Sequence, residues 1–285
     1  MFTRHTSLPA DEQAALESAL ERFDGDVDVV LTEAISKLAD PRLEEVVRSL
    51  LFQPNEALPK RKRRPDIYLP FLVRQLYHAC DPNGTDEREL LGVCLTYLEY
   101  TDALDDLVDA DADPEHSPLV YFTVHTAHLL TYALLADFGN AAVEYFTDHA
   151  VETAASVAME LKHEPSLERY LAVLDRQSHL FAGLTGLPAL IAGGSRHTVT
   201  EFEELGTCYY KYNQAILDVE QYETKQTARD LDWNLWTLAD DRAVLDRIET
   251  WRDGVTAVTD GFPERRRKLV DGLVSVDVET YRNHL

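Results

Sequence analysis

The sequence predicts an all-α protein, a bundle of helices joined by short connections. Apolar residues recur at spacings of three and four residues over most of the 285-residue chain, as in amphipathic helices. We find no convincing run of the alternating apolar and polar residues that are typical of a half-buried strand. The breaks between the periodic segments are short and rich in turn-forming residues. We therefore expect one domain over residues 1–285, which is long enough to bury a large core.

Each expected helix is a segment with apolar residues at helical periods that ends at a turn signal. In the first half of the chain these segments are residues 11–23, 43–52, 68–79, 86–109 and 119–137. In the second half they are residues 141–162, 166–183, 200–223, 231–245 and 263–274. The turn signals between them are residues 54–59, 81–84, 110–118, 139–140, 193–194 and 260–263. Such short connections favour neighbouring helices that pack side by side.

The chain is strongly acidic. It contains 51 aspartate and glutamate residues against 27 lysine and arginine residues, and its formal net charge is -24. This charge argues against nucleic acids and anionic membrane surfaces as general partners. An acidic composition with few lysines is similar to that of cytosolic proteins from salt-loving microbes, so we expect a halophilic archaeon as the source.

The cysteines and the apolar segments indicate a cytoplasmic protein. Cys80, Cys94 and Cys208 are odd in number, widely spaced and set among apolar residues, so we expect buried free thiols. The N-terminus lacks a basic stretch followed by an apolar run. No uninterrupted apolar segment approaches the ~18 residues of a spanning helix. We therefore expect no stable membrane insertion, and any lipid contact should lie inside a pocket.

Four aspartates fall on one face of the helix expected over residues 86–109. They are Asp102, Asp105, Asp106 and Asp109, spaced three and four residues apart. Like charges one turn apart destabilise a helix unless a cation neutralises them, and their oxygens suit Mg²⁺, which keeps positions for phosphate oxygens. The stripe therefore predicts a metal and diphosphate site. The alternative is a solvated acidic face, against which the apolar residues of the same helix argue, because they define a buried side.

A basic run stands out against this acidic background. Residues 60–64 are five consecutive cations, followed by Pro65 and then by an expected helix. An isolated basic run is usually solvated or binds nucleic acid, and the net charge of the chain argues against nucleic acid. Together with an acidic metal helix, the run fits a diphosphate site, where the basic run on one side and the metal ion on the other neutralise the negative charge of the diphosphate.

Taken in order, these motifs resemble the trans-isoprenyl diphosphate synthases, the polyprenyl synthetase family of class I isoprenoid synthases. The resemblance covers residues of roughly 40 to 280 and identifies a divergent member. Residues 105–109 are similar to the first aspartate-rich motif of the family. Residues 59–65 are similar to its Gly-Gly-Lys-Arg-x-Arg-Pro motif, with Arg61 and Arg64 at the two diphosphate-binding positions.

Three later stretches resemble the same family. Residues 170–181 are similar to the tract that carries a Lys-Thr pair, with Arg176 in the place of the lysine. Residues 212–218 are similar to the Phe-Gln-x-x-Asp-Asp approach to the second aspartate-rich motif, and they retain Gln214 and Asp218. Lys225 lies where the family has a lysine loop behind that motif.

The resemblance implies an isoprenoid-synthase bundle with a central prenyl-diphosphate cavity. Mg²⁺ would grip an allylic prenyl diphosphate, which ionises and then condenses with isopentenyl diphosphate to a short or medium chain prenyl diphosphate. The implied metal ligands are Asp105, Asp109 and Asp218. The implied catalytic residues are Asp105, Asp106, Asp109, Arg176 and Lys225. The implied substrate-binding residues are Arg61, Arg64, Gln214 and Tyr100. We also expect a homodimer.

Tyr100 is expected to limit the length of the prenyl chain. It lies five residues before Asp105, about one and a half helical turns away, so its ring should point along the channel for the growing tail. In the family a bulky aromatic residue at this position goes with short or medium chains, which implies a product no longer than geranylgeranyl. The alternative is that Tyr100 packs between helices and the channel ends elsewhere.

Departures from the family pattern leave two other functions open. The Arg-Arg-Gly that usually follows the first motif is replaced by residues 111–118, which hold no cation before His116. In the second motif Leu217 and Gln221 stand where aspartates are expected, and Glu220 or Glu223 would have to substitute. These losses suit a terpene synthase or lyase that acts on a single prenyl diphosphate. A non-catalytic subunit of a prenyl synthase accommodates all of them.

Overall fold

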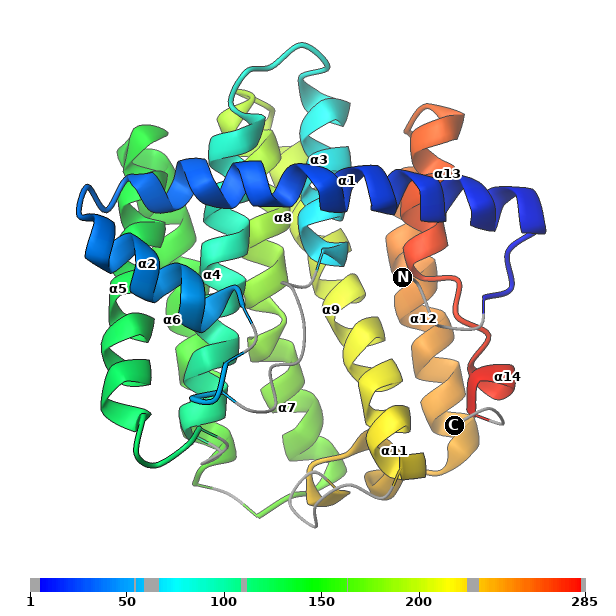
Figure 1. Cartoon of the computed structure of the whole chain (residues 1–285). Helices are drawn as coiled ribbons and strands as arrows, with labels where there is room; N and C mark the ends of the chain where they lie inside the picture. The colour runs from blue at the N-terminus through cyan, green and yellow to red at the C-terminus, as the bar shows by residue number, and fades with distance from the viewer. Residues whose placement is uncertain are drawn as a thin grey trace. The chain divides into compact units, whose positions relative to one another are not determined.

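The computed structural model describes residues 6–53, 55–58, 67–108, 112–162, 164–224 and 231–282. Within these ranges the structure is helical and contains no strand, apart from one isolated antiparallel bridge between Thr6 and Val276. The helices, drawn in Figure 1, are α1 (Ala10–Ser36), α2 (Pro41–Leu51), α3 (Tyr68–Cys80), α4 (Glu87–Val108), α5 (Ser117–Asp137), α6 (Asn140–Glu160), α7 (Leu167–Gln177), α8 (His179–Ile191), α9 (Arg196–Thr224), α11 (Leu235–Leu238), α12 (Asp241–Thr259), α13 (Glu264–Leu273) and α14 (Val278–Arg282). The prediction of an all-α protein is confirmed.

The chain divides into two compact units. The central unit consists of Leu20–Val143, and the terminal unit combines Met1–Ala19 with Glu144–Leu285. Helix α1 begins in the terminal unit and continues into the central unit, and α6 begins in the central unit and continues into the terminal unit. The expectation of one domain over the whole chain stays a prediction.

The central unit is built on α4 and α5, which pack along each other, with α2 and α3 against them. A hydrogen bond of 3.0 Å joins the buried hydroxyls of Thr96 on α4 and Thr131 on α5. The rings of Phe23 on α1 and Phe71 on α3 meet edge to face, with centroids 5.7 Å apart. The Thr96–Thr131 contact ties the middle of α4 to α5, and the last turn of α4 carries the predicted acidic site.

Helix α5 corrects one expectation from the sequence. By length and composition it is apolar enough to cross a membrane, which was not expected, although it contains no uninterrupted apolar run of that length. Polar Thr and His residues interrupt its apolar residues, which hid the overall hydropathy of the helix. Half of the helix is buried inside the protein, as is usual for a core helix.

The terminal unit is built on α9, the longest helix. Helices α8 and α12 pack along α9, the shorter α7, α11 and α14 contact it, and α13 packs on α12. Close approach of α8 and α9 depends on Gly206, because a Cβ atom there would lie 2.1 Å from the hydroxyl oxygen of Thr185. That hydroxyl donates a hydrogen bond of 2.7 Å to the carbonyl of Phe202, which ties the two helices together.

Several helix boundaries differ from the predicted ones. The helix expected over residues 11–23 continues to Ser36, because apolar side chains remain on its buried face. These are Val27, Val30, Leu31, Ala34 and Ile35. The acidic residues around Gly25 obscured this face, since Asp-Gly-Asp is typical of turns. The segment expected as one helix over residues 166–183 forms two, α7 and α8, which meet at Ser178.

The helix expected over residues 231–245 is also interrupted. The side chain of Asn234 accepts a hydrogen bond from the backbone N–H of Trp236, and that of Asp240 accepts one from Ala243. Each residue therefore caps a new helix, α11 and α12, instead of lying inside one. Helix α14 was not predicted. The three cysteines are free, as expected, with Cys94 buried and Cys80 and Cys208 half-buried.

Candidate functional site

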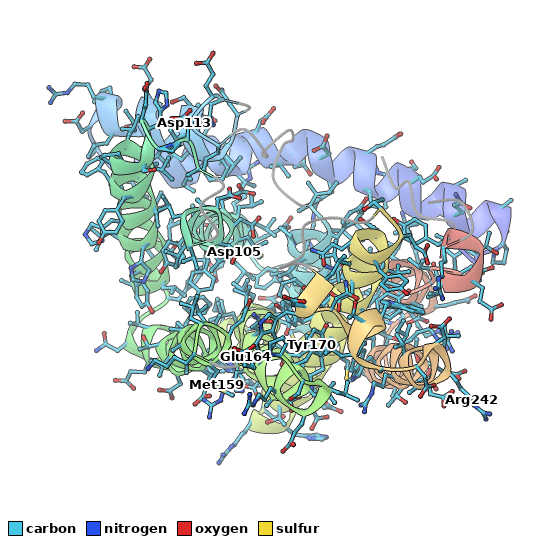
Figure 2. All side chains as sticks on the ribbon, turned by 90° about the horizontal axis from the view of Figure 1, so that it is seen from below. Asp105, Asp113, Met159, Glu164, Tyr170 and Arg242 are labelled. Carbon is cyan, nitrogen blue, oxygen red and sulfur yellow. The ribbon has the colours of Figure 1, made fainter. Side chains whose placement is uncertain are left out.

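Asp105 and Asp106, from the first acidic motif, lie in the last turn of α4. Ala103 is fully buried at this point, whereas Asp105 is exposed and Asp106 is half-buried (Figure 2). The last turn carries no basic residue, and the negative end of the helix dipole lies here. A cation bound at this turn would therefore interact favourably with both the helix dipole and the carboxylates.

The chemistry of these side chains fits Mg²⁺. This ion binds proteins through one or two carboxylates and keeps several coordination positions for water or substrate phosphate. Among the described residues, no group of three histidine, cysteine, aspartate or glutamate side chains is arranged to hold a metal ion. Metal binding itself stays a prediction.

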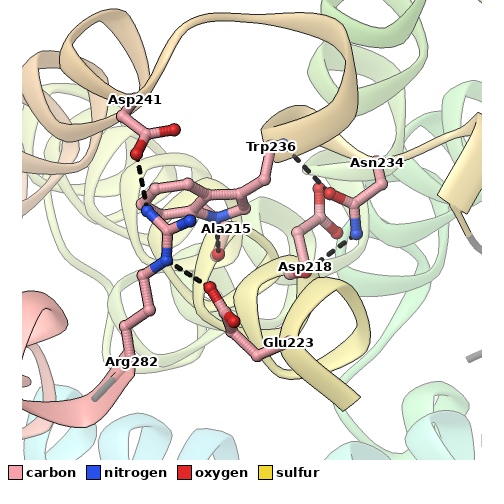
Figure 3. A network of polar contacts seen from close by, with 7 residues as sticks. All are labelled: Ala215, Asp218, Glu223, Asn234, Trp236, Asp241 and Arg282. Carbon is pink, nitrogen blue, oxygen red and sulfur yellow. Dashed lines mark hydrogen bonds and ion pairs between the residues drawn. The ribbon is translucent and has the colours of Figure 1, made fainter. Parts of the chain in front are cut away.

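Asp218, on α9, has four hydrogen-bond partners, of which Figure 3 shows Asn234. It is fully buried, and its carboxylate accepts hydrogen bonds from the Tyr170 hydroxyl (2.7 Å), the Leu235 backbone N–H (2.7 Å) and the Gln214 side chain (2.9 Å). The Asn234 side chain donates to the Asp218 backbone carbonyl (2.8 Å). The structure therefore brings Gln214 and Asp218 together, one helical turn apart. The involvement of Tyr170 and Asn234 was not predicted.

The charge states within this network follow from burial. Burial raises the pKa of Asp218 above its usual range, while the hydrogen bonds from Leu235, Tyr170 and Gln214 act in the opposite direction. Burial and the adjacent Asp218 carboxylate raise the pKa of Tyr170 well above its usual value. The Tyr170 hydroxyl therefore keeps its proton and remains a hydrogen-bond donor.

Arg176 lies in the last turn of α7 and forms an ion pair. Its Nη1 atom is 2.5 Å from Oε2 of Glu152 on α6, and both side chains are partly exposed to solvent. Such a pair contributes only about 0–1 kcal/mol to stability, so the guanidinium group can exchange its partner for a phosphate at small cost. The predicted role of Arg176 in binding the leaving diphosphate stays a prediction.

Removal of the competing carboxylate is expected to strengthen diphosphate binding. In Glu152→Gln the Arg176 guanidinium group loses its charged partner, so inorganic diphosphate with Mg²⁺ should bind about two- to fivefold more tightly. Arg176→Gln should weaken the same binding. Isothermal titration calorimetry measures both changes. Arg169→Gln, which removes an exposed arginine of the same helix, is the matched control, and Arg176→Gln with the affinity of this control would contradict the role.

Tyr100 belongs to a row of aromatic rings between α4 and α5. Its ring stacks on His128 with centroids 4.7 Å apart and planes at 18°. Tyr97 lies 5.6 Å from Tyr100, and Tyr132 meets the edge of His128 at 5.0 Å. Tyr100 is half-buried, and burial raises its pKa. The contact with His128 agrees with packing between helices, and the role of Tyr100 as a channel floor stays a prediction.

The predicted site residues are divided between the two units. Those in the central unit are Tyr100, Asp105 and Asp106, and those in the terminal unit are Arg176, Gln214 and Asp218. The remaining four predicted residues lie outside the described ranges, and their roles stay predictions. They are Arg61, Arg64, Asp109 and Lys225.

A second polar cluster, in the terminal unit, was not predicted. His149 on α6 places its Nδ1 atom 3.1 Å from Nδ1 of His179 on α8, and its Nε2 atom 3.4 Å from Glu203 on α9. A Cβ atom at Gly183 would lie 2.9 Å from the Cβ of His149, so this glycine permits the approach. In the sequence, only Gly183 and Gly186, three residues apart in α8, indicated that another helix packs closely here.

Comparisons with known proteins identify the fold. No protein-family model and no curated protein matches the sequence. Among solved structures, a polyprenyl synthase from Caulobacter crescentus, complexed with calcium and isoprenyl diphosphate, has a TM-score of 0.73 at 14% identity and covers 94% of this chain and 98% of its own. A decaprenyl diphosphate synthase from Rhodobacter capsulatus has a TM-score of 0.70 at 17% identity, covering 93% and 98%.

A geranylgeranyl pyrophosphate synthase from Corynebacterium glutamicum has a TM-score of 0.68 at 16% identity, covering 96% of this chain and 95% of its own. The protein therefore has the all-α fold of prenyl synthases over nearly its whole length. The predicted isoprenoid-synthase bundle is confirmed as a fold.

Proposed function

We propose that this protein is a Mg²⁺-dependent prenyltransferase of isoprenoid biosynthesis. It would ionise an allylic prenyl diphosphate and condense it with isopentenyl diphosphate to a short or medium chain prenyl diphosphate. The observation that carries the proposal is the acidic last turn of α4, where Asp105 and Asp106 reach solvent from an otherwise largely buried helix. The fold supports it, because structures named as synthases of prenyl diphosphates match 93% or more of this chain.

The proposed roles of the residues follow from their chemistry. Asp105, Asp106 and Asp109 would hold Mg²⁺, which supplies positive charge to the diphosphate when bound. Arg176 and Lys225 would donate charge-assisted hydrogen bonds to the leaving diphosphate. The allylic carbon–oxygen bond breaks, and both electrons go to the diphosphate oxygen. The double bond of isopentenyl diphosphate forms the new carbon–carbon bond, and the released diphosphate accepts the proton that is lost.

Incubation with Mg²⁺ and geranyl, farnesyl or geranylgeranyl diphosphate, with and without isopentenyl diphosphate, tests this function. An elongated diphosphate formed only with isopentenyl diphosphate would support it. A hydrocarbon or alcohol formed from the allylic substrate alone would indicate a terpene synthase or lyase. Absence of turnover would indicate a non-catalytic subunit.

Isopentenyl diphosphate is expected to bind weakly compared with the allylic substrate. The arginine pair that usually follows the first motif is missing between residues 111 and 118. Each lost charge-assisted hydrogen bond removes on the order of 1.5–3 kcal/mol, so two losses should weaken binding by about a hundredfold or more. Calorimetry with each diphosphate alone measures the difference, and tight binding of isopentenyl diphosphate would contradict the expectation.

We also propose that the protein is a homodimer that pairs through α5. Large apolar side chains are exposed on this helix, namely Leu119, Tyr121, Phe122 and Leu129. The helix has no aspartate, glutamate, lysine or arginine before Asp137, although 27% of the whole chain is charged. Two copies of a protein with a net charge of -24 would meet with least repulsion on such an uncharged face.

The dimer is expected to separate when a charge is placed on this face. Leu129→Glu should produce monomers in sedimentation velocity, because an isologous interface would bury the new carboxylate twice. Val29→Glu, at a partly exposed valine of α1, is the matched control and should remain dimeric. A wild-type protein that sediments as a monomer, or a dimeric Leu129→Glu variant, would contradict pairing through α5.

A further inference from the structure

The carboxylate of Asp218 is held by three protein donors. A carboxylate offers about four lone-pair positions, and the Tyr170 hydroxyl, the Gln214 amide and the Leu235 N–H occupy three of them. The residue is fully buried, and its own backbone carbonyl is occupied by Asn234. A Mg²⁺ ion needs accessible oxygens and retains several waters, which this surrounding does not offer.

The two glutamates that follow on α9 are also held by the protein. Glu220 accepts a hydrogen bond from the Tyr281 hydroxyl, and Glu223 pairs with Arg282, both on α14. Arg282 also contacts Asp241 at 2.7 Å and lies over the ring of Trp236, 4.9 Å from its centroid. Figure 3 shows the Arg282 guanidinium group between the carboxylates of Glu223 and Asp241. Both glutamates therefore already have protein partners on α14.

The donors around Asp218 come from three different parts of the terminal unit. Tyr170 lies on α7, Gln214 on α9 itself, and Leu235 at the start of α11, where Asn234 also caps the helix. Trp236, the next residue of α11, donates from its indole N–H to the Ala215 carbonyl of α9 at 3.2 Å. The network thus joins α7 and α11 to one turn of α9.

We propose that Asp218 is a structural anchor that joins α7 and α11 to α9 and does not bind metal, so that the acidic end of α4 binds Mg²⁺ and diphosphate without Asp218 as a ligand. The statement about Mg²⁺ and diphosphate rests on the proposed function. The statement that Asp218 is an anchor depends only on its contacts. It replaces the assignment of Asp218 as a metal ligand that the family resemblance implied.

Three variants of the full chain distinguish a structural role of Asp218 from metal binding. For each variant, the melting temperature is measured, and calorimetry gives the dissociation constant of inorganic diphosphate with Mg²⁺. Asp218→Asn should lower the melting temperature by about 5–10 °C, because its NH2 group cannot accept a hydrogen bond and leaves at least one of the three donors unpaired, while the dissociation constant stays within about twofold. Tyr170→Phe should lower the melting temperature by about 3–5 °C with the same unchanged affinity. Asp105→Asn should show the opposite pattern, an unchanged melting temperature and binding weakened by about tenfold or more.

A loss of affinity of about tenfold or more in folded Asp218→Asn would overturn the proposal. If that variant does not fold, Tyr170→Phe decides, because it removes one donor and leaves the carboxylate in place. A lower melting temperature with unchanged affinity supports the anchor, and an unchanged melting temperature overturns it. If wild type does not bind the probe, or Asp105→Asn binds it as wild type does, the proposed function fails, and the melting temperatures alone still decide whether Asp218 is an anchor.

Discussion

Asp105→Asn is expected to reduce the consumption of an allylic prenyl diphosphate by on the order of a hundredfold to a thousandfold. Asparagine keeps the shape of the side chain but removes the charge that would hold Mg²⁺. The folded state should be little affected, because Asp105 is exposed at the negative end of the α4 dipole, beside Asp102 and Asp106. The unfolding free energy should therefore change by less than about 1 kcal/mol.

The matched control is Glu89→Gln, which removes an exposed carboxylate from the first turn of the same helix. Its activity should stay within about twofold of wild type, since the change lies at the opposite end of α4. Product release from a labelled allylic diphosphate measures activity, and circular dichroism measures the helical content. Full activity in Asp105→Asn would end the interpretation of this turn as a catalytic site and would leave the solvated acidic face as its explanation.

Tyr100→Ala is expected to lengthen the prenyl chain that is made or accepted, by one or more five-carbon units. The ring lies about one and a half turns before the acidic end of α4 and is supported from α5 by the stacked His128. Removal of the ring leaves a space next to His128 into which a longer tail can extend. Because Tyr100 is only half-buried, the variant should lose about 2 kcal/mol of stability, less than the roughly 3–5 kcal/mol of a fully buried ring.

Tyr100→Phe distinguishes the effect of the ring from that of the hydroxyl group. It retains the stacking on His128, so its products should match those of wild type in length. Chromatography of the products after dephosphorylation gives the chain lengths, and thermal unfolding gives the stability of each variant. If Tyr100→Ala is destabilised but makes the same products as Tyr100→Phe, then Tyr100 only packs between α4 and α5, and the floor lies elsewhere.

Most of the fold was predictable because it depends on local periodicity. Helices α3, α4 and α5 lie within one or two residues of their predicted bounds, since each is a periodic segment that ends at a turn signal. The errors occur where a turn-like sequence lies inside a helix, as at Gly25, or where a side chain caps a new helix, as at Asn234 and Asp240. Such a residue can lie inside a continuous helix or cap a new one, and tertiary packing decides between the two conformations.

The candidate site was predictable to the extent that it lies on one helix. The exposed aspartates at the end of α4 follow from spacing alone, because residues three and four apart share a helix face whatever surrounds the helix. The three hydrogen bonds to the Asp218 carboxylate were not predictable in this way. Its donors Gln214, Leu235 and Tyr170 are 4, 17 and 48 residues away, and only the first is set by helical spacing.

The sequence by itself therefore determined the all-α class and the acidic turn of α4, because both arise from interactions within a few residues. Only the tertiary structure decided that Arg176 pairs with Glu152, that Tyr100 stacks on His128, and that Asp218 is enclosed by donors. Each of these partners comes from another helix, and helical periodicity does not specify which helices become neighbours. An aspartate in a motif looks the same in the sequence whether it faces water or the core. Its burial follows from packing, and burial decides whether its oxygens are accessible to a metal ion or accept hydrogen bonds from the protein.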